Sequence, residues 1–249
     1  MKRNGCVLLL LLFLLTGRLC ACAEPDLTLL DPSPRSGSWP EVYAQLLTEH
    51  SAGIQAYQDY VAEVTYSPVC RPVGFIDLTG DGIPELLFTD LTWNQDYGFQ
   101  VGRLWIYTSD GDEVRCMLTL VPEIDDLLYS RYYLAEDGLL TVYLSDCEMS
   151  WILRLRPDAE GPYAAETVLT EQADFSGEGP DFYYLNGATV SPEQYRSLEE
   201  QVRAGRGEMI GSLNVEEEGY GFTYTLAEAL EALPSLAGTF LQSSSIPAG

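Results

Sequence analysis

Five oxygen-bearing positions alternate along residues 77–85, which read DLTGDGIPE. Four of them offer a side-chain oxygen and one offers a main-chain carbonyl: Asp77, Thr79, Asp81, Ile83 and Glu85. Gly82 occupies the sixth position, where loops that wrap a hard cation need a sharp turn. A flexible cage of oxygens suits Ca²⁺, whereas Mg²⁺ demands octahedral geometry and retains water. The spacing therefore predicts one bound Ca²⁺, and the alternative is a hairpin turn with solvated acids.

The loop differs from an EF-hand, because position 12 is Phe88 in place of a bidentate glutamate and strand-like residues flank it. It resembles the calcium loop of FG-GAP and VCBS-type repeats, D-x-[DN]-x-D-G-x-x-[DE] between strands. Thr79 replaces the usual Asp or Asn, and one loop stands where a propeller carries several, so the resemblance implies no propeller. The expected role of the ion is structural, since it would pin two strands and neutralise local charge.

Most of the mature chain resembles a broad group of uncharacterised bacterial secreted lipoproteins, and the loop is the specific part of that resemblance. That group typically has a helix before one such loop, then strands, then a helix introduced by NG…S-x-E-x-Y, as in residues 186–195 here. The resemblance implies an extracytoplasmic protein and does not name its partner.

The first residues predict export. Lys2 and Arg3 precede nine apolar residues from 7 to 15, far fewer than the roughly 20 of a spanning helix, so residues 1–21 are interpreted as a signal peptide. The sequence LCAC at 19–22 resembles a lipobox and predicts acylation of Cys22. The alternative is secretion after cleavage following Ala23.

The net charge of the mature chain limits the classes of partner that the protein can bind. After the signal the chain keeps 38 acidic residues and ten arginines, a net charge of −28, with no lysine. Such a surface repels nucleic acid and anionic lipid headgroups, so contact with a membrane is expected only through the N-terminal lipid.

The cysteines and the single histidine give little indication of a catalytic or metal site. Cys70, Cys116 and Cys147 remain beside Cys22, and the pair Cys116–Cys147 is preferred for a disulfide because both lie in strand-like runs. His50 is interpreted as a surface residue of a helix.

The periodicity predicts an α+β fold, an antiparallel β-meander sheet with flanking helices. Residues 22–37 are interpreted as a flexible tether, 38–240 as one domain and 241–249 as a frayed tail. Capping boxes begin helices at Ser38 and Ser191, the second ending at Gly205, and a shorter helix spans residues 225–233. Gly53 is expected to kink or divide the first helix. Period-two runs from residue 73 onward, with turns at 110–111 and 137–138, predict the sheet.

The sequence favours a non-catalytic surface protein over an enzyme, because it contains no nucleophile, zinc or phosphate-loop motif. The alternative is a carbohydrate-binding module, in which aromatic rings stack on a sugar. Its stacking residues would be Trp93, Tyr97, Trp105 and Tyr107. An acid-pair glycoside hydrolase is the third hypothesis, with Asp125–Asp126 and Glu216–Glu218 as its pairs.

Overall fold

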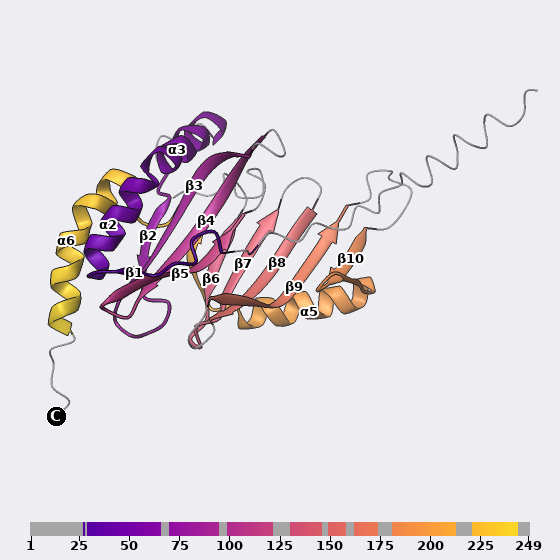
Figure 1. Ribbon diagram of the computed structural model, residues 1–249. Coiled ribbons are helices and arrows are strands. Elements are labelled where there is room, and N and C mark those ends of the chain that lie inside the picture. The colour runs from indigo at the N-terminus through magenta and orange to yellow at the C-terminus, as the bar shows by residue number, and fades with distance from the viewer. Residues whose placement is uncertain are drawn as a thin grey trace, which may run out of the picture.

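The computed structural model describes residues 27, 29–65, 70–94, 99–121, 130–145, 149–157, 162–173, 181–212 and 221–243. These residues form an α+β fold with two antiparallel sheets and four helices (Figure 1). The helices are α2 (Trp39–Glu49), α3 (Ser51–Thr65), α5 (Pro192–Gly205) and α6 (Leu226–Ser243).

The first sheet has five strands in the order β1-β5-β4-β3-β2. They are β1 (Arg35–Ser36), β2 (Val73–Ile76), β3 (Glu85–Asn94), β4 (Phe99–Ser109) and β5 (Glu113–Leu120). Gly111, at φ +105°, turns the chain from β4 into β5, as the Asp110–Gly111 pair predicts.

The second sheet has seven strands in the order β11-β10-β9-β8-β7-β6-β12. They are β6 (Arg131–Leu134), β7 (Leu140–Ser145), β8 (Met149–Pro157), β9 (Tyr163–Gln172), β10 (Phe182–Leu185), β11 (Ala188–Thr189) and β12 (Glu208–Ser212). Gly138, at φ +78°, confirms the second predicted turn, between β6 and β7.

The prediction of one meander sheet is wrong, because the strands divide into two sheets that share a core. One face of the first sheet, through Leu87, Leu104 and Ile106, joins a single buried cluster with Val142 and Leu153 of the second. The next residues along β3 and β4, such as Phe88 and Trp105, belong to a different cluster on the opposite face. Both faces of the first sheet are therefore buried, and polar residues such as Thr89 and Asp90 are buried with the apolar ones.

Helices cover the two outer faces, which gives four layers (Figure 1). Tyr43 of α2 and Leu233 of α6 belong to the cluster on the outer face of the first sheet. The α5 helix packs Tyr195 and Val202 on the outer face of the second sheet. The burial of one stripe on each helix follows from its apolar spacing.

The observed ends of the helices can be compared with the capping boxes and boundaries that the sequence predicts. Ser191 and Gln194 form the predicted capping box, and α5 ends at Gly205 as expected. The Ser38 box is not formed, because the Ser38 side chain makes no capping hydrogen bond. The α6 helix continues through Pro234 to Ser243, well beyond the predicted residue 233 and into the stretch expected to fray.

The first helix divides at His50 rather than at Gly53. Gly53 instead lets α3 approach β3, since a Cβ there would lie 3.0 Å from the Leu91 carbonyl oxygen and 3.2 Å from Asp90 Oδ2. The glycine is therefore a close-packing position between helix and sheet.

The predicted tether is ordered over part of its length. The β1 strand pairs with β5, and the Leu30 N–H lies 3.4 Å from Thr119 Oγ1. Leu29 packs against the buried cluster under α2 and α6. These contacts place the start of the folded domain before residue 38.

A short segment at residues 221–225 joins the two sheets at one edge. Gly221 exchanges main-chain hydrogen bonds with Ser212 of β12, and Tyr224 does so with Val73 of β2. The Phe222 N–H donates to the carbonyl of Arg71 over 2.6 Å. The segment therefore pairs with an edge strand of each sheet.

We predict that Gly221→Ala destabilises the protein by at least about 3 kcal/mol, because a Cβ would lie 2.1 Å from the Arg71 carbonyl oxygen at φ +116°. Gly111→Ala is the matched control, since φ is +105° there but no atom lies within 4 Å. It should cost only about 1–2 kcal/mol. Urea denaturation measures both values, and equal losses would contradict the bridging role of residues 221–225.

Candidate metal loop and its surroundings

The loop between β2 and β3 is organised by its own aspartates. Asp77 accepts hydrogen bonds from the Gly80 N–H at 2.7 Å and the Gly82 N–H at 3.0 Å, one on each carboxylate oxygen. Asp81 Oδ1 accepts from the Ile83 N–H at 2.8 Å. Gly80 and Gly82 have φ of +75° and +85°, which allows the chain to close around the Asp77 carboxylate.

Glu85, the last of the predicted ligands, is buried where the loop meets β3. Its carboxylate accepts from the Leu78 N–H at 2.5 Å, from Thr108 Oγ1 at 2.7 Å and from Thr79 Oγ1 at 3.4 Å. Burial raises the pKa of Glu85 to about 7, the charges of Asp81 and Asp77 act in the same direction, and the first two hydrogen bonds oppose it. Glu85 therefore ties the loop to β4 at the cost of placing a carboxyl group among other acids.

The donor chemistry of the loop fits Ca²⁺, but the side chains are not gathered into a metal cage. No set of three Asp, Glu, His or Cys side chains within the described ranges converges as a metal-binding group. Each carboxylate oxygen of Asp77 holds one N–H and can accept at a second site. Asp77 and Asp81 are thus oriented by main-chain donors and keep capacity for a cation.

The loop forms one wall of a cleft of about 700 Å³. Residues 77–81 face the β6–β7 turn at 135–138, and the end of β4 with Arg115 and Met117 of β5 completes the lining. Both turns bring acids, Asp110 after β4 and Glu136 with Asp137 between β6 and β7. The cleft is therefore acidic on both sides.

A buried ionic cluster lies deeper on the helix-covered face of the first sheet. Asp90 of β3 accepts from Arg103 Nε at 2.8 Å and Trp105 Nε1 at 3.0 Å on one oxygen. Its other oxygen lies 2.6 Å from an Arg103 terminal nitrogen and 2.9 Å from His50 Nδ1. Burial would raise the pKa of Asp90, but the hydrogen bonds and charges of His50, Arg103 and Trp105 outweigh it and lower that pKa.

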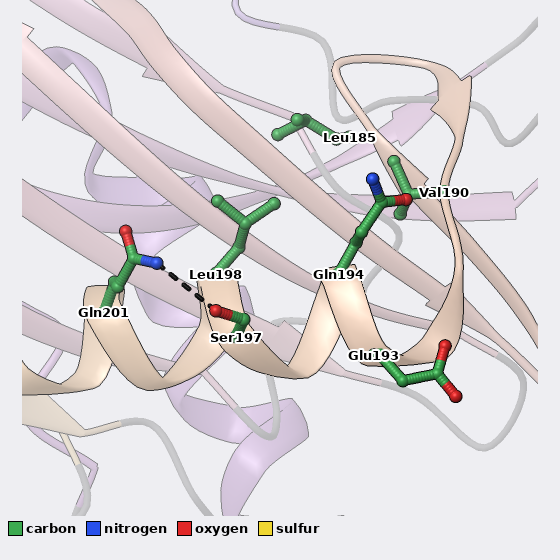
Figure 2. A pocket seen from close by; sticks show the side chains of 7 residues that line it. All are labelled: Leu185, Val190, Glu193, Gln194, Ser197, Leu198 and Gln201. Atoms are coloured by element: carbon green, nitrogen blue, oxygen red, sulfur yellow. Dashed lines mark hydrogen bonds between the residues drawn. The ribbon is translucent and has the colours of Figure 1, made fainter.

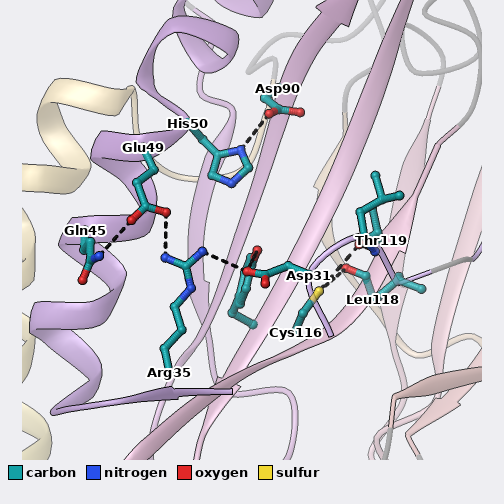
Figure 3. Close-up of polar contacts among 11 residues, drawn as sticks. Asp31, Arg35, Gln45, Glu49, His50, Asp90, Cys116, Leu118 and Thr119 are labelled. Carbon is teal, nitrogen blue, oxygen red and sulfur yellow. Dashed lines mark hydrogen bonds and ion pairs between the residues drawn. The ribbon is translucent and has the colours of Figure 1, made fainter. Parts of the chain in front are cut away.

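His50 is consequently not the surface residue that the sequence suggested. It ends α2, packs against Phe88 and Trp105, and points at Asp90 (Figure 3). The partners of Asp90 are 13 to 40 residues away along the chain, so spacing could not reveal them. The one local signal was an aspartate inside the apolar strand ELLFTDL.

A second polar cluster holds the N-terminal segment in place (Figure 3). Arg35 of β1 pairs with Glu49 of α2 at 2.7 Å and with Asp31 at 3.0 Å. Tyr107 donates its hydroxyl to Asp31 over 3.2 Å. These contacts explain why residues before 38 are ordered against the domain.

The predicted sugar-stacking residues do not form one exposed face. Trp105 and Tyr107 are buried, at 3% and 1% exposure, and stack on Phe88 beneath the helices. Trp93 is 59% exposed, and Tyr97 lies outside the described residues. Because Trp105 and Tyr107 are in the core, they offer no surface to a sugar.

The predicted Cys116–Cys147 disulfide is not formed. Cys116 is a free, buried thiol whose pKa burial raises to about 11, and its Sγ lies 3.5 Å from the Leu118 carbonyl oxygen (Figure 3). Cys70 is likewise free and buried. Other predicted positions lie outside the described part of the chain: Cys22, Cys147, Asp125, Asp126, Glu216 and Glu218.

A second hollow, of about 410 Å³, lies between α5 and the β10–β11 hairpin (Figure 2). Leu185, Val190 and Leu198 supply its apolar lining, and side chains of the first turns of α5 supply the polar rim. Ser197 accepts a hydrogen bond from Gln201 at 3.4 Å across that rim. The hollow carries no cluster of ionisable groups that suggests chemistry.

Comparison with known proteins gives no relatives: no family model, curated protein or solved structure matches the chain. The helices of the described residues include none with the length and apolar character needed to cross a membrane.

We predict that Asp90→Asn costs about 3–5 kcal/mol at neutral pH, because the amide turns a donor toward groups that already donate and leaves Arg103 without a charge partner. Asp112→Asn, on the exposed β4–β5 turn, should change stability by less than about 0.5 kcal/mol. Urea denaturation at pH 7 compares the two variants.

The difference in unfolding free energy between wild type and Asp90→Asn can also be measured as a function of pH. Since the folded-state pKa of Asp90 is lowered, its ionised form contributes stability above the unfolded pKa of about 3.9, and this is lost as pH falls through the folded pKa. The difference in unfolding free energy between wild type and Asp90→Asn should therefore become smaller only in acid. A gap that is constant down to pH 2 would contradict the cluster's charge assignment.

Proposed function

We propose that this protein is a non-catalytic, extracytoplasmic lipoprotein whose 77–85 loop binds one structural Ca²⁺. The observation that carries the proposal is the arrangement of three carboxylates at one turn. Main-chain N–H groups orient Asp77 and Asp81, and Glu85 is buried directly behind them. The Thr79 hydroxyl and the Ile83 carbonyl complete the proposed ligand set.

Charge supports a cation at this turn. Within the described ranges, Asp77, Asp81 and Glu85 form no ion pair with an arginine, and Asp81 and Asp77 both raise the pKa of Glu85. A divalent ion supplies two positive charges at the loop, which offsets the mutual repulsion of the acids.

The contacts of Glu85 support a structural role for that ion. Its carboxylate already connects Leu78 in the loop with Thr108 at the end of β4. A cation that holds Asp77 and Asp81 would therefore fix the whole turn against the first sheet. The proposed ion therefore acts on folding stability and takes part in no reaction.

We predict that calcium raises the melting temperature and that chelator lowers it. A neutral ligand at Thr79 suits the weaker extracellular range of about 10⁻⁴–10⁻³ M. At ten times the dissociation constant, binding adds about 1.4 kcal/mol, which is a rise of roughly 3–6 °C for a chain of this size. Differential scanning fluorimetry with calcium and with chelator measures the rise.

Asp81→Asn is the sharpest variant, since it removes one charge, keeps the shape of the side chain and leaves an oxygen for the Ile83 N–H. It should abolish most of the calcium response. Glu63→Gln, on the exposed face of α3, removes the same charge and should leave the response intact. Wild-type melting that ignores both calcium and chelator would refute the metal loop.

The lipid anchor has its own test. We predict that a radiolabelled fatty acid marks the wild-type protein and that Cys22→Ala abolishes the label, because the lipobox thiol is the acceptor. Cys70→Ala is the matched control and should keep the label. An unlabelled product that begins at Glu24 would show that cleavage follows Ala23 instead.

A further inference from the structure

The outer face of the second sheet carries two arginines that have no acidic partner in the part of the chain that the structure describes. Among the described residues, neither Arg154 of β8 nor Arg206, which follows α5, forms an ion pair. Acids of the same region are paired elsewhere, Glu199 with Arg203 and Glu166 with Arg156. The positive charge of Arg154 and Arg206 is therefore not offset by a direct contact.

Strand register places these groups together. Thr141 of β7 lies opposite Tyr133 on one side and opposite Arg154 on the other, so the three side chains form one row on the same face. Neighbours in such a row have Cβ atoms about 5 Å apart. Arg206 lies over the Tyr133 ring, with Cζ 4.0 Å from the centroid, and 5.7 Å from the Tyr143 centroid. Arg154 is thus the direct neighbour of Thr141 in this row, and Arg206 lies over the ring of its other neighbour, Tyr133.

Several donors on this face of the sheet lack acceptors among the described residues. Thr141 is fully buried, and its hydroxyl has no hydrogen-bond partner in the described structure. Arg154 and Tyr143 are partly exposed, but Arg154 Nε and the Tyr143 hydroxyl oxygen are buried atoms that likewise have no hydrogen-bond partner there. Arg206 uses the face of its guanidinium for stacking, which leaves the N–H groups at its edge free to donate. Unsatisfied buried donors are costly, and an acceptor bound among them would remove that cost.

We infer that Arg154, Arg206 and Thr141 form a binding site for a phosphate group on the outer face of the second sheet. Two guanidinium groups supply charge-assisted hydrogen bonds, and the hydroxyl supplies a donor from a third direction. A tetrahedral oxyanion has enough oxygens to accept from all three, whereas a planar carboxylate has two. The site is separate from the calcium loop and does not depend on it.

Isothermal titration calorimetry in calcium-free, low-salt buffer tests this site with inorganic phosphate and with glycerol 3-phosphate. The site predicts a dissociation constant of about 1 mM or tighter for one of them. If both inorganic phosphate and glycerol 3-phosphate bind, the site accepts phosphate esters. If only inorganic phosphate binds, the site has no room for the ester group. Arg154→Gln and Arg206→Gln should each weaken binding at least about tenfold.

Two further variants separate a phosphate site from a purely structural role of these residues. Thr141→Val should keep or raise the melting temperature, because it removes an unpartnered buried hydroxyl, yet weaken phosphate binding about threefold to tenfold. Arg115→Gln, in the acidic cleft, matches the charge change and should leave binding unchanged. No binding by wild type, or equal losses in Arg115→Gln and Arg154→Gln, would overturn the inference.

Discussion

The shared core between the two sheets is the constraint on which the other features depend. Alternate residues of β3 and β4 enter that core through Leu87 and Ile106, so the residues between them must be buried under helices instead. This second burial brings Asp90 inside, where only the donors of His50, Arg103 and Trp105 make an ionised carboxylate tolerable. The same packing brings the loop residues 77–81 and the turn at 135–138 to opposite walls of one cleft.

Charge is distributed unevenly over this framework. Acids gather at the turns around the cleft. At the start of β3, burial raises the pKa of Glu85 to about 7, and the charges of Asp81 and Asp77 act in the same direction. On the outer face of the second sheet, by contrast, Arg154 and Arg206 lack acidic partners among the described residues. A cation at the first place and an oxyanion at the second would each relieve a local imbalance, although the two sites use different strands and ligands.

Local signals in the sequence predicted local structure well. The box of Ser191 and Gln194 and the glycine turns at 111 and 138 depend on residues a few positions apart, and all are present. The number of sheets could not be predicted. Period-two alternation identifies a strand and its buried face, but it does not say which other strands lie beside it or which sheet packs on that face. The His50–Asp90 contact and the pairing of β1 with β5 also join distant segments, so spacing gave no sign of them.

A crystal of the protein grown with calcium would show whether residues 77–85 hold the proposed ion. Anomalous scattering collected at long wavelength locates the ion without assumptions about its ligands. We expect one peak about 2.3–2.6 Å from oxygens of Asp77 and Asp81, with Thr79, Ile83 and Glu85 completing the shell. A map with no peak at the loop, in crystals soaked well above millimolar calcium, would contradict the account and leave residues 77–85 as a hairpin turn.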